Sequence, residues 1–385
     1  MLIYAIAFLL LYTGIDIYTG VRLLGLLKFF FPDIKILVFW LLYIVTCYSM
    51  LPLLLLRFNT VGLYSFPLIL YFMFTLLFFD LLYLIFRFLR CPVPPAYTAA
   101  GTGIALGLAI LVMFYGAIHS RNIQTVHYSV ELKSSQPSSN LRLVLVSDMH
   151  IGAVVTRKWV SNIVDAVNEA KPDIICLAGD TFDFGPQYLG RDLNGIISEL
   201  KELNAPLGVY ACQGNHDVDR ISFKQNLNEA DPLTGIKSAL EKAGIVLLLD
   251  ESALVDKRFY LTGRRDARPI GMNYERKSAA DLTAGLDKSI PIIFLDHQPV
   301  DFENEEEVNA GLILCGHTHR GQFFPGNIIT SLIFKKAGGV DYGYWQGKSA
   351  QAIVSSGAGI WGPPIRIGTQ SEIAVIDIHF SGENP

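Results

Sequence analysis

Four long runs of apolar residues occupy the first third of the chain. They cover residues 2–27, 36–56, 62–84 and 98–118, and each approaches the roughly 20 residues that a helix needs to cross a bilayer. The loops between the runs are short and carry Pro, Lys and Arg. The first run follows Met1 without a charged leader or a small-residue cleavage site, which favours a retained membrane segment over a signal peptide. Residues 1–118 are therefore predicted to form a transmembrane region of about four helices.

The pattern changes after residue 118. Residues 119–140 are mostly polar and are predicted to be a linker, although 126–132 alternate as a strand would. From residue 141 onward, short apolar runs of strand length alternate with amphipathic helical segments, and the later part is richer in strands. Strands that alternate with helices indicate an α/β fold. Residues 141–385 are therefore predicted to form one α/β domain.

Composition and charge support this division. The 385 residues are 51% hydrophobic and 17% charged, with a mean hydropathy of +0.37, which is too apolar for a wholly soluble protein. Residues 1–118 hold six Lys or Arg against three Asp or Glu (net +3), and the rest hold 25 against 32 (net −7). A nucleic-acid surface needs clustered Lys and Arg, so the acidic second part argues against nucleic acid as a partner. The five cysteines do not suggest a disulfide framework.

Basic residues are unevenly distributed around the apolar runs. The first and third loops, with their flanks, hold five: Arg22, Lys28, Lys35, Arg87 and Arg90. The opposite side holds two, Arg57 and Arg121. Because cytoplasmic loops carry an excess of Lys and Arg, the first and third loops are expected in the cytoplasm. Everything after residue 118 is then expected outside the cytoplasm.

Two acidic residues, Asp16 and Asp80, fall inside the apolar runs. An ionised carboxylate is costly in a membrane unless it is paired or hydrated. A hydrogen bond inside the helix bundle or a place at the membrane surface is the favoured interpretation. A proton or substrate contact is the alternative.

Metal-binding residue types recur directly after the predicted strands. In chain order they are Asp148, His150, Asp180, Asn215, His297, His317 and His319. The carboxyl ends of strands are where open α/β sheets place their ligand sites, and carboxylate, imidazole and amide ligands suit manganese, iron or zinc. If Asp180 bridges, the seven residues divide into two sets of four, as in a two-metal site. Gly179, Gly214 and Gly316 are expected to allow the tight turns that project these side chains.

The order of these motifs resembles that of the calcineurin-like metallophosphoesterases. The family pattern D-x-H, G-D-x-x-D, G-N-H-[DE], H and G-H-x-H is matched in full, over about residues 142–380. The closing run 355–372 resembles the membrane-associated or exported bacterial subgroup. The resemblance implies a four-layer sandwich of two β-sheets flanked by helices. Arg320 follows the last motif where the family commonly has Gly, and Gln370 and Ser371 precede Glu372 where Pro is common.

The resemblance also implies roles for individual residues. Asp148, His150, Asp180 and His319 would hold one divalent metal ion, and Asp180, Asn215, His297 and His317 would hold the second. A hydroxide between the metals would attack phosphorus, and His216 would protonate the leaving oxygen while Asp217 holds its ring; a merely buried His216 is the alternative. Asp183 is expected to brace its loop. Arg366 is expected to contact a substrate phosphate or to form a surface ion pair, and Arg320 could change substrate preference.

The sequence thus predicts a membrane-anchored phosphodiesterase or phosphohydrolase that uses two divalent metal ions, manganese, iron or zinc. Tethering to the bilayer favours a lipid or lipid-linked phosphoester or pyrophosphate as substrate, while a soluble phosphomonoester or cyclic nucleotide remains open. A transporter-like or scaffold protein with a regulatory metal-binding domain is the alternative, and the intact ligand set argues against it. The apolar run 323–334 is predicted to be sheet core; a lip for acyl chains or the bilayer surface is the other interpretation.

Overall fold

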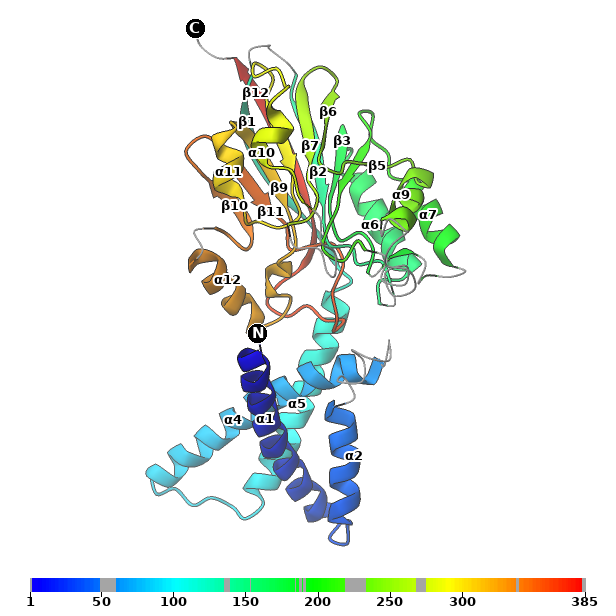
Figure 1. The fold of residues 1–385 in the computed structure, drawn as a ribbon. Helices are drawn as coiled ribbons and strands as arrows, with labels where there is room; N and C mark the ends of the chain where they lie inside the picture. The colour runs from blue at the N-terminus through cyan, green and yellow to red at the C-terminus, as the bar shows by residue number, and fades with distance from the viewer. Residues whose placement is uncertain are drawn as a thin grey trace. The chain divides into compact units, whose positions relative to one another are not determined.

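The computed structural model describes residues 2–48, 60–134, 139–152, 154–183, 185–186, 189, 192–218, 233–267, 275–336 and 339–382. The chain divides into two compact units (Figure 1). The helical unit comprises Met1–Ile118 with Gly362–Ile365, and the α/β unit comprises His119–Trp361 with Arg366–Pro385.

The helical unit contains α1 (Leu2–Phe30), α2 (Ile36–Tyr48), α4 (Thr60–Phe88) and α5 (Tyr97–His119). Three of these are long and apolar enough to cross a membrane, over Ile6–Phe30, Gly62–Phe88 and Tyr97–His119. The second predicted run is represented by the 13 residues of α2. Its remainder, residues 49–56, and Arg57 lie outside the described residues.

Polar groups link three of these helices. Arg22 of α1 forms an ion pair of 2.7 Å with Asp80 of α4 and donates a hydrogen bond of 3.2 Å to Thr102 of α5. Tyr18 donates a further hydrogen bond to Asp80. The carboxylate of Asp80 is therefore paired inside the bundle, as its place in an apolar run favours. Arg22 belongs to this network rather than to a loop, so the first and third loops keep four basic residues instead of five.

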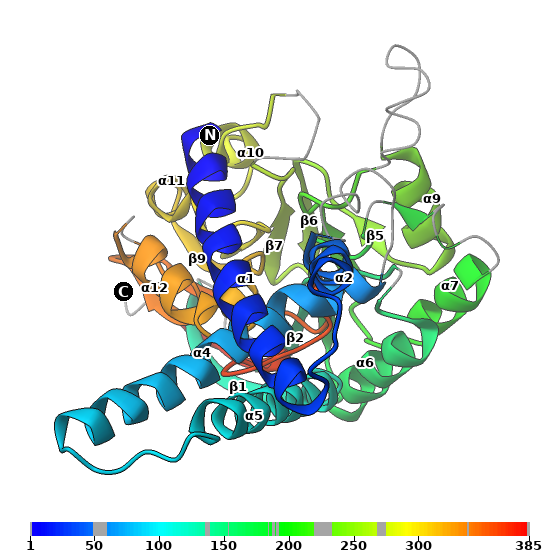
Figure 2. The ribbon, with the colours of Figure 1, turned by 90° about the horizontal axis from the view of Figure 1, so that it is seen from below.

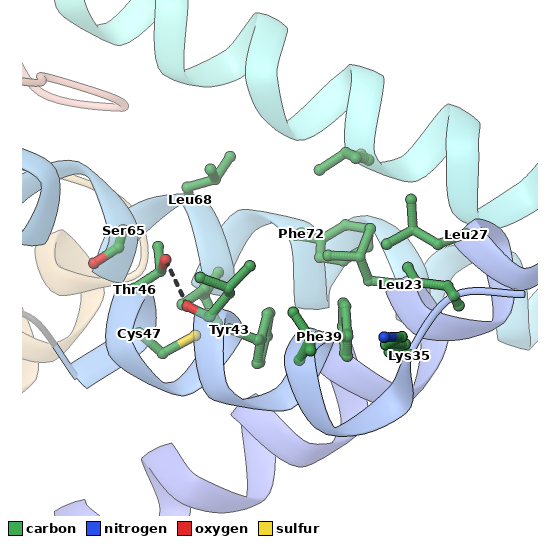
Figure 3. Close-up of a pocket in the computed structure, with 15 residues that line it drawn as sticks. Leu23, Leu27, Lys35, Phe39, Tyr43, Thr46, Cys47, Ser65, Leu68 and Phe72 are labelled. Atoms are coloured by element: carbon green, nitrogen blue, oxygen red, sulfur yellow. Dashed lines mark hydrogen bonds between the residues drawn. The ribbon is translucent and has the colours of Figure 1, made fainter. Parts of the chain in front are cut away.

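A cavity of about 630 Å³ lies among α1, α2, α4 and α5 (Figure 3). Its walls are largely apolar side chains, including Leu23, Phe39 and Phe72, and Lys35 also lines it. Such walls suit hydrocarbon better than water.

The α/β unit contains two six-stranded sheets. The first has the order β1 (Ile123–Ser134), β12 (Ser371–Gly382), β2 (Leu141–Val146), β3 (Ile174–Ala178), β4 (Val209–Cys212) and β5 (Val246–Leu247). The second has the order β10 (Gly343–Gln346), β11 (Gln351–Val354), β9 (Ala310–Cys315), β8 (Ile292–Leu295), β7 (Phe259–Gly263) and β6 (Glu251–Val255). Strand β1 lies in the segment predicted to be a linker, and it pairs in parallel with β12 along its whole length.

Alternating side chains of the strands build three hydrophobic layers. Leu143 and Leu145 of β2 enter the core between the two sheets, whereas Val144 and Val146 pack on the helical side, as the two-residue period of a strand requires. Helices α6 (Arg157–Glu169), α7 (Leu193–Lys201) and α9 (Thr234–Lys242) cover the first sheet, and α10 (Ala279–Thr283) and α11 (Phe302–Glu307) cover the second (Figure 2). The predicted four-layer sandwich is confirmed.

The apolar run after the last motif does not join this core. Instead of a strand it forms α12 (Gly326–Lys336), none of whose residues is buried. Pro325 directly precedes the helix, a position where its missing N–H costs no hydrogen bond. The prediction of sheet core for residues 323–334 is therefore wrong, because the helix presents its apolar side chains outward.

Candidate active site

The seven predicted ligands come from loops that follow five strands. Asp148 and His150 follow β2, Asp180 follows β3, and Asn215 follows β4, three neighbouring parallel strands of the first sheet. His297 follows β8, while His317 and His319 follow β9, its parallel neighbour in the second sheet. The two sheets present these strand ends at a common place, and all seven side chains meet there.

One set of donor atoms surrounds His150. Its Nε2 lies 3.0 Å from Nε2 of His319 and 3.5 Å from Oδ2 of Asp180. Nε2 of His319 lies 3.4 Å from Oδ1 of Asp148. Two imidazoles and two carboxylates thus converge on one small volume.

A second set surrounds Asn215. Its Oδ1 lies 3.1 Å from Nε2 of His297 and 2.9 Å from Nδ1 of His317. Oδ2 of Asp180 lies 3.2 Å from the same His297 nitrogen. Because this Asp180 oxygen also belongs to the first set, Asp180 is placed to bridge the two.

The hydrogen-bonding capacity of these atoms shows that a cation fits. His297 Nδ1 lies 2.8 Å from the carbonyl oxygen of Ala178, which can only accept, so Nδ1 carries a hydrogen. In the neutral ring, Nε2 then presents a lone pair to oxygens of Asp180 and Asn215. A neutral ring would leave three acceptors facing one another, so this position needs a positive charge, which either a proton on Nε2 or a divalent metal ion can supply.

The pKa shifts around Asp180 reflect the same need for positive charge. Burial opposes the charged form of His297, but the charge and hydrogen bond of Asp180, together with the charges of Asp148 and Asp266, raise the pKa of the ring well above its usual value. Burial would raise the pKa of Asp180, yet the charge and hydrogen bond of His297 lower it well below normal. Burial, assisted by the charge of His297, lowers the pKa of His317 to about 3. A neutral imidazole is the form that binds metal.

Five of the seven residues have a left-handed backbone. The φ angles are 51° at Asp148, 45° at His150, 50° at Asp180, 73° at His317 and 48° at His319. Residues with a Cβ occupy this region at an energetic cost, and such residues gather at functional sites. The strain is therefore concentrated on the side chains that converge.

The three motif glycines serve two purposes. Gly179 has a φ of 79°, as a tight turn requires. Gly214 and Gly316 instead leave room for carboxylates: a Cβ at Gly214 would lie 2.2 Å from Oδ1 of Asp180, and one at Gly316 would lie 2.2 Å from Oδ2 of Asp148. Close approach, rather than turn geometry, explains these two glycines.

The partner of His216 differs from the sequence expectation. Its Nδ1 lies 3.1 Å from Oδ1 of Asp183, so Asp183 and not Asp217 orients the ring. The carboxylate of Asp217 accepts backbone N–H groups of its own and the neighbouring loop, at 3.0 Å from Gly214, 2.9 Å from Phe182 and 3.3 Å from Thr181. Asp183 therefore takes the role expected of Asp217, holding the ring of His216, and Asp217 takes the loop-bracing role expected of Asp183. Asp183 ends the G-D-x-x-D motif, which was the available signal.

The two candidate substrate arginines lie in different surroundings. Arg366 is fully buried, and its guanidinium donates to the carbonyl oxygens of His319 at 3.1 Å, Ser356 at 2.7 Å and Gly359 at 2.8 Å. It thus braces the backbone of a predicted ligand from behind, and burial lowers its pKa to about 10. The guanidinium of Arg320 stacks 4.2 Å from the ring centre of Tyr342.

Residues 141–321 match the profile of the calcineurin-like phosphoesterases. The chain belongs to this family. The dinuclear metal centre that the family uses agrees with the two donor sets that share Asp180 in this phosphoesterase.

Three relatives illustrate what the chain is similar to. An uncharacterized metallophosphoesterase of Aquifex aeolicus is 27% identical over 71% of this chain and 99% of its own length. A transmembrane protein with metallophosphoesterase domain from Danio rerio is 30% identical over 71% of this chain and 62% of its own. Phosphodiesterase YaeI of Escherichia coli is 29% identical over 47% of this chain and 61% of its own. This phosphoesterase is therefore similar both to a transmembrane protein and to a phosphodiesterase.

Proposed function

We propose that this phosphoesterase is a membrane-anchored phosphodiesterase or pyrophosphohydrolase that requires two divalent metal ions and acts on a lipid or lipid-linked substrate. The observation that carries the proposal is the pair of donor sets joined by Oδ2 of Asp180. Asp148, His150, Asp180 and His319 would hold one ion, and Asp180, Asn215, His297 and His317 the other. When bound, two such ions supply an activated water and neutralise charge on the phosphoryl oxygens.

The chain itself supplies a proton donor. Asp183 accepts the hydrogen on Nδ1 of His216 and so fixes the ring, which leaves Nε2 to pass a proton to the departing oxygen. The ring centre of His216 lies 5.8 Å from that of Trp361, whose side chain is half exposed. His216 itself is buried, and Trp361 is the exposed residue beside it; we infer that a leaving group would depart past Trp361.

The lipid part of the proposal rests on the helices. Three helices are long and apolar enough to span a membrane, and only residues 120–122 separate α5 from β1. At no more than ~3.3 to 3.6 Å per residue, this connection keeps the start of β1 beside the end of the span. A substrate in the same membrane is thus favoured. The basic residues of the first and third loops, four against two, favour an extracytoplasmic α/β unit.

The first experiment measures hydrolysis of bis-para-nitrophenyl phosphate by the full chain in detergent with added Mn²⁺. Asp180→Asn and His317→Ala are expected to abolish turnover while the helices stay inserted, because the ligands are independent of the spans. Asp287→Asn, a change at an exposed carboxylate, is the matched control and should be fully active. Normal turnover by Asp180→Asn would contradict the two-metal proposal.

The second experiment identifies the substrate class. The full chain is incubated with a total lipid extract, and mass spectrometry follows which lipids lose a phosphoryl group, with Asp180→Asn as the inactive reference. Cleaved lipids in the active sample alone are expected. Activity on the para-nitrophenyl ester without any lipid cleavage would leave the phosphodiesterase intact and remove the lipid substrate.

A further inference from the structure

Helix α12 exposes its apolar face, whereas a surface helix of a soluble protein buries it. Four of its apolar side chains are strongly exposed: Ile328 at 48%, Ile329 at 53%, Leu332 at 64% and Ile333 at 59%. Their spacing of i, i+1, i+4 and i+5 places them on one helical face. On another side, Thr330 donates a hydrogen bond of 2.9 Å to Asp341. A surface helix normally buries its apolar face and exposes its polar one, so α12 is built to meet an apolar medium.

The charge of α12 favours an anionic membrane surface as the apolar medium that it meets. Its sequence, GNIITSLIFKK, contains no acidic residue and ends in Lys335 and Lys336, both exposed. Phe324, just before the helix, is also exposed. An apolar face with an aromatic residue at one end and lysines at the other is typical of helices that lie in the surface of an anionic bilayer.

Hydrogen bonds tie α12 to the place where the chain enters the α/β unit. His119, the last residue of α5, lies with Nε2 3.2 Å from the carbonyl oxygen of Thr369. Thr369 donates to the carbonyl oxygen of Gln322, and Phe324 N–H donates at 2.9 Å to Ile367 in the same strand-like segment. The segment that supports α12 is therefore linked through Thr369 to His119, the last residue of α5.

We propose that α12 docks onto the surface of the anionic bilayer that α5 crosses, with its apolar face among the acyl chains and its two lysines at the lipid phosphates. The helix of eleven residues would lie about 16 Å along the surface. Gln322 also exchanges two hydrogen bonds of 2.9 Å with the backbone of Trp361, whose ring centre lies 5.8 Å from that of His216. Docking thus turns the site toward lipid headgroups; this last consequence rests on the proposed function, whereas docking itself does not.

The test measures membrane depth and involves no catalysis. The full chain carries Cys91→Ser, which removes the exposed cysteine, and Leu332→Cys. A nitroxide spin label is attached at position 332. The labelled protein is reconstituted, one copy per disc, in nanodiscs of phosphatidylcholine and phosphatidylglycerol. Collisions with oxygen, which concentrates in the bilayer, are compared with collisions with a water-soluble nickel chelate. Leu254→Cys on β6, whose native side chain is 47% exposed, is the matched control.

Docking predicts that oxygen relaxes the label at position 332 at least ~5-fold more than nickel does, a preference reversed at position 254. Nickel dominance at position 332 would place α12 in water and overturn the proposal. Poor access of both reagents would also overturn it, because protein rather than lipid would cover the helix. The double substitution Lys335→Glu and Lys336→Glu should reduce the membrane depth of the label, and only in discs that contain anionic lipid. An unchanged depth would show that the two lysines do not contribute to docking. Ile329→Cys repeats the measurement one turn away should the first variant fold poorly.

Discussion

The ring of His216 lies beside the carboxylate of Asp183 on one side and the ring of Trp361 on another. A general acid matters most when the leaving oxygen is a poor leaving group. We therefore expect His216→Ala to slow hydrolysis of alkyl phosphodiesters roughly 10²-fold, but to slow release of para-nitrophenolate far less. The measurement is kcat on the two ester types. Equal losses on both would indicate that His216 supports the structure instead.

Asp183 and Asp217 can be separated by the same pair of substrates. Asp183→Asn should reproduce the selective loss of His216→Ala at a smaller size, because the ring loses its charged partner but keeps a hydrogen-bond acceptor. Asp217→Asn should lower the midpoint of thermal unfolding and reduce both activities together, because its carboxylate accepts three backbone N–H groups. The opposite pattern would restore Asp217 as the residue that orients His216.

Sequence spacing located the convergent residues but did not reveal every partner. The motifs end strands that are neighbours in each sheet, so the meeting of seven side chains follows from topology. The direction of a side chain depends on the loops around it. Asp217 turns back onto the backbone at Thr181 and Phe182, and Arg366 turns inward to carbonyl groups, because backbone groups of neighbouring loops lie within hydrogen-bonding distance there. A motif does not encode those neighbours.

Where loops from different strands approach closely, adding a single methyl group should disturb the site. A Cβ at Gly214 would lie 2.2 Å from both N and Oδ1 of Asp180, so Gly214→Ala must displace the carboxylate that the two donor sets share. Displacing a reacting group by about 1 Å can cost ~10²-fold in rate, and we expect a loss of this size together with weaker Mn²⁺ binding, measured by calorimetry. Gly285→Ala is the control, because a Cβ there meets nothing within 4 Å. Equal behaviour of the two variants would rule out close approach as the reason for Gly214.

Between membrane helices, the pair of Arg22 and Asp80 couples α1 to α4. Removing one partner leaves the other charge unpaired in the bundle, which costs more than removing both. Thermal unfolding in detergent should show Asp80→Asn and Arg22→Gln each destabilising, and the double variant less than their sum, with a coupling of about 0.5 to 3 kcal/mol. Additive effects would show that the pair contributes no net stability.

Strands were predicted well where a short apolar run directly precedes a motif. The run 141–146, which precedes Asp148, forms β2. The run 323–334 was assigned to the core because an apolar run has the same composition whether it faces protein or lipid. Strand β1 lay in a polar stretch, and its membership of the sheet depends on pairing with β12, more than 200 residues later in the chain. The local sequence does not reveal which distant strand a strand pairs with, or whether an apolar segment faces protein or another medium.

For the molecule as a whole, the side of the membrane is the property that most constrains its substrate. Arg22 no longer counts as a loop charge, yet Lys28, Lys35, Arg87 and Arg90 still favour a cytoplasmic position for the first and third loops. Cys91 offers a native reporter in the third loop, because it is exposed whereas the other four cysteines are buried.

A membrane-impermeant maleimide added to intact cells with a permeabilised outer envelope should therefore leave Cys91 unmodified and label it after lysis. Leu254→Cys in a Cys91→Ser chain should be labelled before lysis, because a membrane crossing by α5 would place the α/β unit on the opposite side from the third loop. Labelling is read by mass spectrometry of the tryptic peptides. Modification of Cys91 in intact cells, with protection of position 254, would place the catalytic unit in the cytoplasm. The substrate would then be sought among nucleotide-linked lipids made on that face, since the two metal-binding sets would be unchanged and only the accessible phosphoesters would differ.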